Sequence, residues 1–240
     1  NAVGRWRPAL NQGAEAQDRG DFDTALRLFS QAEVLGEPMG SARFNIGVSL
    51  QQLKQHDKAL GNFAAAEAKG FTEAALYYHR GESQYALGRF AEAFGSFTQA
   101  LSHPQAPDAD EFTRLRHAEA AVASQKYDEA IASYRILIQK SPDKQRYKVG
   151  LSMAHVGKKD YVAAMDILNP AIAQRPTGPA YYARALTHLY LGNRAASTQD
   201  LAVALRSEPN NPIYQRLQSM LDEPAGKPAD KIATKIGVKP

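Results

Sequence analysis

The sequence predicts an all-α fold, an α-solenoid of about six helical hairpins that ends in a C-terminal capping helix. Three observations predict it. One residue pattern recurs about every 34 residues, the recurring blocks have the apolar spacing of amphipathic helices, and proline stands at the ends of the later blocks. The chain has 240 residues, of which 44% are hydrophobic and 22% charged, values typical of a folded globular protein.

The recurring block contains an alanine, a bulky residue four positions later and a small residue three positions after that. It is clearest in GDFDTALRLFSQA at 20–32, QHDKALGNFAAA at 55–66 and GRFAEAFGSFTQA at 88–100. Successive blocks are separated by 34, 34, 37, 34 and 33 residues. The anchor position of the six blocks holds Ala25, Ala59, Ala93, Ala130, Ala164 and Ser197.

The residue types in the block are those that two closely crossing helices require. Small residues are expected where the helix backbones approach each other, and the bulky residues, such as Phe29 and Phe63, are expected to fill the space between neighbouring hairpins. Pro142, Pro176 and Pro209 follow the last three blocks, where proline ends a helix.

A 34-residue period with this pattern resembles the tetratricopeptide repeat family over residues 6–211. Residues 212–222 read as one more amphipathic helix, which we expect to cap the array, and residues 223–240 read as a flexible tail or linker. The resemblance places the repeats near 6–39, 40–73, 74–110, 111–144, 145–177 and 178–211.

Composition and motifs exclude several classes of function. The net charge of +4 arises from 29 basic and 25 acidic residues spread along the chain, so we expect no nucleic-acid partner. The chain has no cysteine, and no apolar run approaches the roughly 18 residues of a membrane span. No spacing of histidines, serines or carboxylates marks a metal site or catalytic machinery. We therefore predict no cofactor, no metal and no enzymatic activity.

The resemblance implies that the first helix of each hairpin lines a concave binding face. Chaperone-binding members of the family hold a carboxylate with Lys at the fifth place of the repeat and Asn at the ninth. Neither residue occurs at these places here, so that function is not expected. The predicted face is instead aromatic, aliphatic and acidic, and its expected peptide-binding residues are Phe44, Tyr78, Glu82, Tyr85, Phe112, Glu119, Arg146, Tyr182 and Tyr190.

These features favour a non-catalytic scaffold that binds a peptide segment or helix of a partner protein. Two alternatives remain open: a structural module that self-associates into a homo-oligomer, and a carbohydrate-binding or regulatory domain of a larger enzyme or exporter. The lack of cysteine fits the cytoplasm and the bacterial periplasm equally well, but together with the missing initiating Met and the linker-like tail it fits bacterial envelope or secretion assembly, so a periplasmic or envelope location is favoured over a cytoplasmic one.

Overall fold

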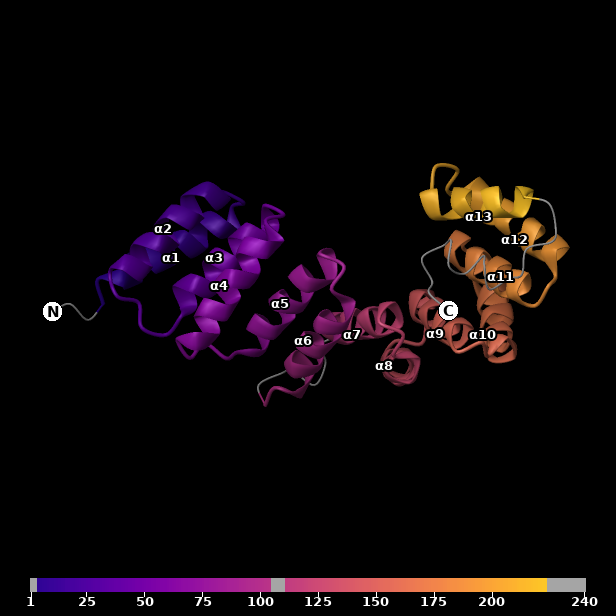
Figure 1. The fold of residues 1–240 in the computed structure, drawn as a ribbon, viewed down its shortest axis with the longest axis horizontal. Helices are drawn as coiled ribbons and strands as arrows, with labels where there is room; N and C mark the ends of the chain where they lie inside the picture. The colour runs from indigo at the N-terminus through magenta and orange to yellow at the C-terminus, as the bar shows by residue number, and fades with distance from the viewer. Residues whose placement is uncertain (1–3, 105–110, 224–240) are drawn as a thin grey trace. The chain divides into compact units, whose positions relative to one another are not determined.

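The chain folds into antiparallel pairs of helices, as seen in a computed structural model that describes residues 4–104 and 111–223 (Figure 1). The described residues contain six helix pairs and one last helix, and no strand. The prediction of an all-α solenoid of helical hairpins is confirmed.

The first helices of the pairs are α1 (Trp6–Asp18), α3 (Ser41–Gln52), α5 (Ala74–Ala86), α7 (Glu111–Ala123), α9 (Gln145–Gly157) and α11 (Gly178–Tyr190). The second helices are α2 (Phe22–Val34), α4 (His56–Ala68), α6 (Phe90–Ser102), α8 (Tyr127–Lys140), α10 (Tyr161–Gln174) and α12 (Arg194–Ser207). The last helix is α13 (Pro212–Asp222).

The turn inside each hairpin contains one residue with a positive φ angle. Glycine adopts this conformation at little cost, whereas other residues place Cβ close to a carbonyl oxygen. Three hairpins have glycine here and three do not. The glycines are Gly20, Gly88 and Gly192, and the other residues are Lys54 at 61°, Gln125 at 63° and Lys159 at 64°. The hairpins thus share one turn geometry, which is strained in three of them.

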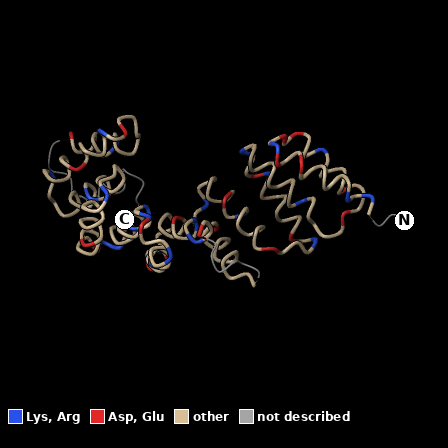
Figure 2. Tube along the Cα trace, turned by 180° about the vertical axis from the view of Figure 1, so that it is seen from behind, with Lys and Arg blue, Asp and Glu red and all other residues tan. Residues whose placement is uncertain are grey.

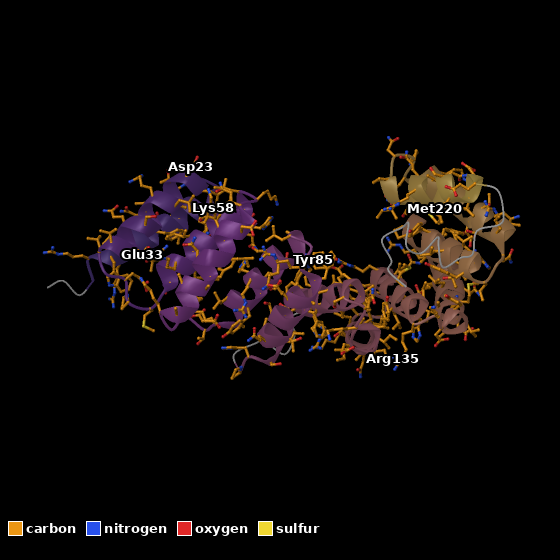
Figure 3. The ribbon with its side chains drawn as sticks, viewed as in Figure 1. Asp23, Glu33, Lys58, Tyr85, Arg135 and Met220 are labelled. Carbon is orange, nitrogen blue, oxygen red and sulfur yellow. The ribbon has the colours of Figure 1, made fainter. Side chains whose placement is uncertain are left out.

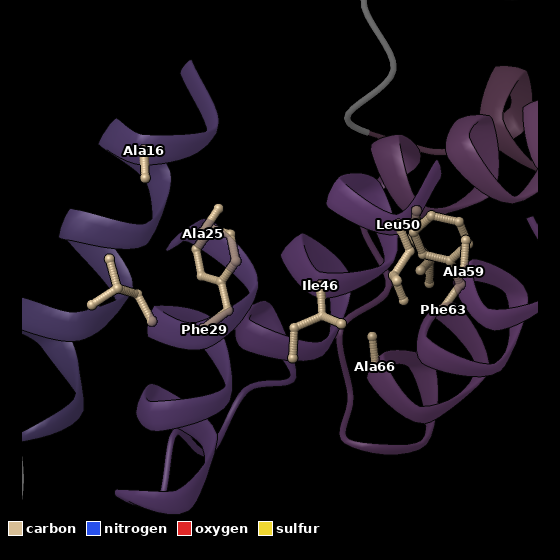
Figure 4. Close-up of a cluster of buried hydrophobic side chains, with 10 residues drawn as sticks. Ala16, Ala25, Phe29, Ile46, Leu50, Ala59, Phe63 and Ala66 are labelled. Carbon is tan, nitrogen blue, oxygen red and sulfur yellow. The ribbon is translucent and has the colours of Figure 1, made fainter. Parts of the chain in front are cut away.

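The anchor residues of the recurring block form the centre of each hairpin, and all six are fully buried. The rings of Phe29 and Phe63 lie against Gly13 and Gly47 in the first helices of their own hairpins. A Cβ atom added at these glycines would lie 2.6 and 2.5 Å from the rings. Figure 4 shows both rings in one buried cluster with side chains such as Ile46. These two aromatic residues therefore fix the crossing within their own hairpins, and the cluster they join extends across neighbouring hairpins.

The chain divides into two compact units, residues 1–120 and 121–240, and the boundary falls within α7. We refer to them as unit 1 and unit 2 and describe each separately.

Two glutamines, the half-buried Gln17 and the buried Gln51, connect successive first helices in unit 1. The side-chain amide of Gln17 donates to Ser49 Oγ at 3.0 Å, and one repeat later the amide of Gln51 donates to Ser83 Oγ at 3.0 Å. Gln51 also donates to the carbonyl oxygen of His79 at 2.8 Å, and its own carbonyl oxygen lies 2.8 Å from His79 Nδ1. These repeated bonds fix the register of α1 against α3 and of α3 against α5.

In unit 2, α13 packs against the last hairpin. Tyr214 and Leu217 are buried in a cluster with Leu201 and Leu186, so the apolar side of this hairpin is covered. The residues expected to form a tail, 224–240, and the connection at 105–110 lie outside the described residues.

Candidate functional site

All nine residues expected to bind a partner lie on first helices. We call the surface formed by the first helices within a unit the first-helix face. Phe112 is 73% exposed and Arg146 is also exposed, whereas the other seven are half-buried. By helix they are Phe44 on α3, Tyr78, Glu82 and Tyr85 on α5, Phe112 and Glu119 on α7, Arg146 on α9, and Tyr182 and Tyr190 on α11.

Three of these residues meet at a single cation in unit 1. Arg116 on α7 donates from Nε to Glu82 Oε1 at 2.5 Å and from Nη1 to Glu119 Oε2 at 2.7 Å. Its guanidinium carbon lies 4.4 Å from the ring centroid of Tyr85, a residue labelled in Figure 3. The Tyr85 ring in turn stands edge-on to Phe90, with centroids 4.9 Å apart. We call Arg116, Glu82, Glu119 and Tyr85 the Arg116 cluster.

The electrostatics of the Arg116 cluster follow from its partial burial. Burial alone would lower the pKa of Arg116, but the hydrogen bonds to Glu82 and Glu119 raise it above its ordinary value. Burial and the nearby carboxylate of Glu119 raise the pKa of Tyr85. At neutral pH the guanidinium is therefore charged and the phenol neutral, and the hydrogen bonds to Glu82 and Glu119 hold the guanidinium in a fixed arrangement.

Arg116 was not among the residues predicted from the sequence. A signal for it exists, because Glu82 and Glu119 occupy the same place in two consecutive repeats. Two carboxylates at the same place on neighbouring first helices favour a cation between them.

Two predicted aromatic residues of unit 1 pack against other rings. Phe44 stacks on Phe71 with ring centroids 4.6 Å apart, and the ring centroids of Tyr78 and Phe97 are 5.9 Å apart. Both therefore serve the packing of the hairpins as well as the first-helix face.

The two predicted tyrosines of unit 2 each stack on another tyrosine. Tyr182 lies 5.0 Å from Tyr214 of α13, and Tyr190 lies parallel to Tyr161 at 5.4 Å. Burial raises the pKa of Tyr182 to about 12. Tyr182 thus helps to attach the last helix.

Arg146 borders a pocket of about 390 Å³ in unit 2. The pocket lies between the start of α9 and the connection from α10 to α11. Its lining residues are Lys144, Gln145, Arg146, Val149, Arg175, Thr177 and Pro179. Three of these are basic and none is acidic. Of the three basic residues, only Arg146 was predicted from the sequence.

The motif YYxR, which occurs in repeats three and six, has the same structural role in both. Arg184 makes two hydrogen bonds to Asp200 of its own hairpin, at 2.7 and 2.9 Å, and one to Asn169 of the preceding hairpin at 3.1 Å. Arg80 likewise bonds Ser96 of its own hairpin at 3.1 Å and Glu67 of the preceding one at 2.9 Å. The arginine of the motif therefore joins successive hairpins.

His155 and His188 occupy the same place in repeats five and six, and each lies near an aspartate carboxylate. His155 Nδ1 is 3.3 Å from Asp160 Oδ2, and His188 Nε2 is 3.8 Å from Asp200 Oδ2. In the described ranges, no three His, Asp or Glu side chains are grouped so that they could hold a metal ion. Within the same ranges, no helix has the length and apolar character needed to cross a membrane.

The fold and the repeated first-helix face define a helical-repeat scaffold, and comparison with known proteins identifies its class. The family model described as Tetratricopeptide repeat matches residues 10–71, 47–110 and 115–179. These matches cover well over half of the chain, which therefore belongs to the tetratricopeptide repeat family. Proteins of this family are in general non-catalytic scaffolds for protein–protein interactions. None of the curated proteins matches the sequence.

Several solved structures share the fold. YrrB, described as a TPR protein with an unusual peptide-binding site, is 17% identical with a TM-score of 0.61, and the match covers 80% of this chain and 97% of YrrB. The pilF protein of Pseudomonas aeruginosa is 15% identical with a TM-score of 0.63, covering 90% of this chain and 97% of pilF. MamA from Desulfovibrio magneticus RS-1 is 15% identical with a TM-score of 0.62, and the match covers 72% of this chain and 96% of the MamA chain. At these identities the likeness concerns the fold alone.

Proposed function

We propose that this chain is a scaffold that binds a segment of a partner protein, as an extended peptide or a helix, on the first-helix face. The observation that carries the proposal is the pairing of an exposed aromatic residue of α7 with the fixed polar cluster that α5 and α7 form together. Phe112 is 73% exposed, and it lies one helical turn before Arg116 and therefore on the same side of α7.

Such a combination suits peptide recognition for two reasons. An exposed aromatic side chain gains a large apolar contact when a partner covers it. The Arg116 cluster presents its carboxylates and guanidinium without further ordering, because each group is already held by the others, so little conformational entropy is lost on binding. YrrB, which has the same fold, is described as having a peptide-binding site, and this supports the class of ligand.

The test is affinity capture from an extract of the source cells with the full chain and two matched variants. Phe112→Ser removes an exposed aromatic residue from the first-helix face. Val162→Ser removes an apolar residue of similar exposure, 69%, from the second helix α10. We expect a protein that is retained by the wild type and by Val162→Ser but not by Phe112→Ser, and binding of that purified protein should show the same pattern in calorimetry.

Equal retention by both variants would place the site elsewhere on the chain. An empty capture, together with concentration-dependent light scattering, would favour the self-associating module. The envelope or secretion role is likewise a proposal, and fractionation of the source cells tests it.

A further inference from the structure

The first hairpin carries a second surface, which is separate from the residues proposed to bind a peptide and does not depend on that function. This surface lies at the edge of the hairpin where α1 begins and α2 ends. We propose that it docks the chain on the surface of an anionic lipid bilayer. We call it the Trp6 edge, and its residues are Arg5, Trp6, Arg7, Val34, Leu35 and Met39.

Exposed apolar side chains are concentrated at the Trp6 edge. Of the eight large apolar side chains that are exposed among the described residues, three lie within residues 34–39. Val34 is 87% exposed and Met39 is 60% exposed, so both project into solvent. Single exposed apolar residues need no explanation, but a group of them marks an interaction site.

The fold does not require apolar residues at these three places. In the next hairpin, 34 residues later, the corresponding residues are Ala68, Lys69 and Glu73. They belong to the same kind of connection, from a second helix to the following first helix. The apolar character of residues 34–39 is therefore specific to the first hairpin, which points to a binding role and not to a packing role.

Trp6 extends the apolar surface from the start of α1. Its ring packs against a buried cluster that includes Ala32, near the end of α2, and Ala42, near the start of α3. The ring therefore lies close to the segment 34–39, and it is only half-buried. Tryptophan combines a large apolar ring with a polar N–H group, and for this reason it is enriched where membrane lipid meets water.

The cations of the Trp6 edge face outward. Arg5 and Arg7 are exposed, and neither guanidinium forms an ion pair within the part of the chain that the structure describes. The guanidinium carbon of Arg7 lies 5.5 Å from the ring centroid of Trp6. No acidic residue occurs in the first turn of α1, so the positive end of the helix dipole adds to the same potential. Figure 2 marks the charged residues along the chain.

Two acidic residues near this edge are held by other groups and contribute little free negative charge. Glu37 is 3% exposed, and its carboxylate accepts hydrogen bonds from backbone N–H groups, including that of Met39 at 2.9 Å. Glu33, labelled in Figure 3, pairs with both Arg43 and Lys69. The exposed charge at the Trp6 edge is therefore positive, and it complements an anionic surface.

An anionic bilayer matches both properties of this surface. Its headgroups attract the arginines, and the apolar layer beneath them accepts exposed apolar side chains. A nucleic acid offers the negative charge but no apolar layer for Val34 and Met39. A protein partner would need a pocket of matching shape for each projecting side chain, whereas a fluid bilayer adapts to them.

The experiment uses Trp6 as its own probe, because it is the only tryptophan of the chain. The full chain is mixed with vesicles of pure phosphatidylcholine, or with vesicles in which phosphatidylglycerol replaces part of this lipid. We expect co-sedimentation with the anionic vesicles and a blue shift of the Trp6 emission, as the ring enters a less polar environment. Neutral vesicles should produce a much smaller change, and added salt should weaken the binding.

Two double variants separate the electrostatic from the apolar contribution. Arg5→Gln/Arg7→Gln should weaken binding to anionic vesicles by about tenfold or more, because each arginine near an anionic surface contributes to the attraction. Val34→Ser/Met39→Ser should weaken it by a similar factor, because less apolar surface enters the lipid. All four residues are exposed, so circular dichroism should show unchanged helix content in both variants.

Matched control variants change residues of the same type and exposure in unit 2. Arg135→Gln alters an exposed arginine of α8, labelled in Figure 3, and Val162→Ser alters a valine of α10 that is 69% exposed. Both should bind anionic vesicles as the wild type does. Equal weakening in the control and test variants, or vesicle binding without a change in Trp6 emission, would overturn the proposal, because the chain would then bind through another surface.

Two further outcomes would assign the Trp6 edge to another ligand and would also overturn the proposal. Inorganic phosphate that competes with vesicles more strongly than sodium chloride at equal ionic strength would indicate a discrete anion site. Absence of vesicle binding, together with a captured protein that is lost in Val34→Ser/Met39→Ser, would indicate a protein partner. Neither outcome bears on capture through Phe112, so the proposed peptide-binding function stands or fails separately.

Discussion

The guanidinium of Arg116 lies over the ring of Tyr85, 4.4 Å from its centroid, and the same group bridges the carboxylates of Glu82 and Glu119. Replacing Arg116 with Gln removes the cation that bridges these two half-buried side chains. We therefore expect the free energy of unfolding to fall by about 2 kcal/mol, measured by urea denaturation.

The matched control removes the carboxylates as well. Glu82→Gln and Glu119→Gln, combined with Arg116→Gln, should recover most of the lost stability because the carboxylate charges that Arg116 bridged are removed together with it. An unchanged free energy of unfolding in Arg116→Gln alone would show that solvent already screens this cluster.

A second prediction concerns pH and rests on His79 in α5. Burial lowers the pKa of His79 from 6.5 to about 4, and its Nδ1 lies 2.8 Å from the side-chain oxygen of Gln51. The unfolded chain therefore takes up a proton near pH 6.5, whereas the folded chain resists it until about pH 4. The contribution of His79 to the free energy of unfolding is fully present above pH 6.5. It falls by at most about 3 kcal/mol between pH 6.5 and about 4, and it does not change further below that pH.

The melting temperature measured by circular dichroism from pH 7.5 to 4 tests this dependence. His79→Asn retains an amide donor for Gln51 but does not titrate, so its profile should be flatter than that of the wild type. Parallel profiles for the two proteins would assign the pH dependence to other groups.

Two glycines of one hairpin should respond to alanine in opposite ways. A Cβ at Gly47 would lie 2.5 Å from the Phe63 ring, whereas at Gly61, within α4, no atom lies within 4 Å of the added Cβ. Gly47→Ala should lower the free energy of unfolding by about 2 kcal/mol through overpacking. Gly61→Ala should raise it by up to about 1 kcal/mol, because alanine favours the helix. Effects of the same sign in urea denaturation would contradict this account.

Most of the fold was predictable because its determinants are local and repeated. The 34-residue spacing fixes which residues must be small, and Ala25, Ala59 and Ala93 are fully buried in agreement with it. The positive φ angles of Lys54 and Lys159 were not predictable from residue type, because lysine has no preference for that conformation. They follow only from the turn geometry that all six hairpins share.

The binding residues were less predictable, because the sequence pattern indicates on which helix and on which face a residue lies but not which side chains it contacts. The sequence places both Tyr85 and Tyr182 on first helices. Only the tertiary structure shows that Tyr85 lies under Arg116 while Tyr182 stacks on Tyr214 of α13. The basic pocket was missed for a similar reason, since Arg175 approaches Arg146 through a connection that has no repeated pattern.

The last prediction concerns Ser197, which occupies the anchor position where the other five repeats have alanine. Its hydroxyl is fully buried and has no hydrogen-bond partner. A buried polar group without a partner costs free energy, and alanine fits the same position elsewhere in the chain. Ser197→Ala should therefore raise the free energy of unfolding by about 1 kcal/mol.

Ser152 is the matched control. It is equally buried, but its hydroxyl donates to the carbonyl oxygen of Val149 at 2.7 Å, so Ser152→Ala should bring no gain in the free energy of unfolding. Thermal unfolding of both variants decides the point, because an equal rise in melting temperature would show that the gain comes from alanine's helix propensity and not from the unpaired hydroxyl.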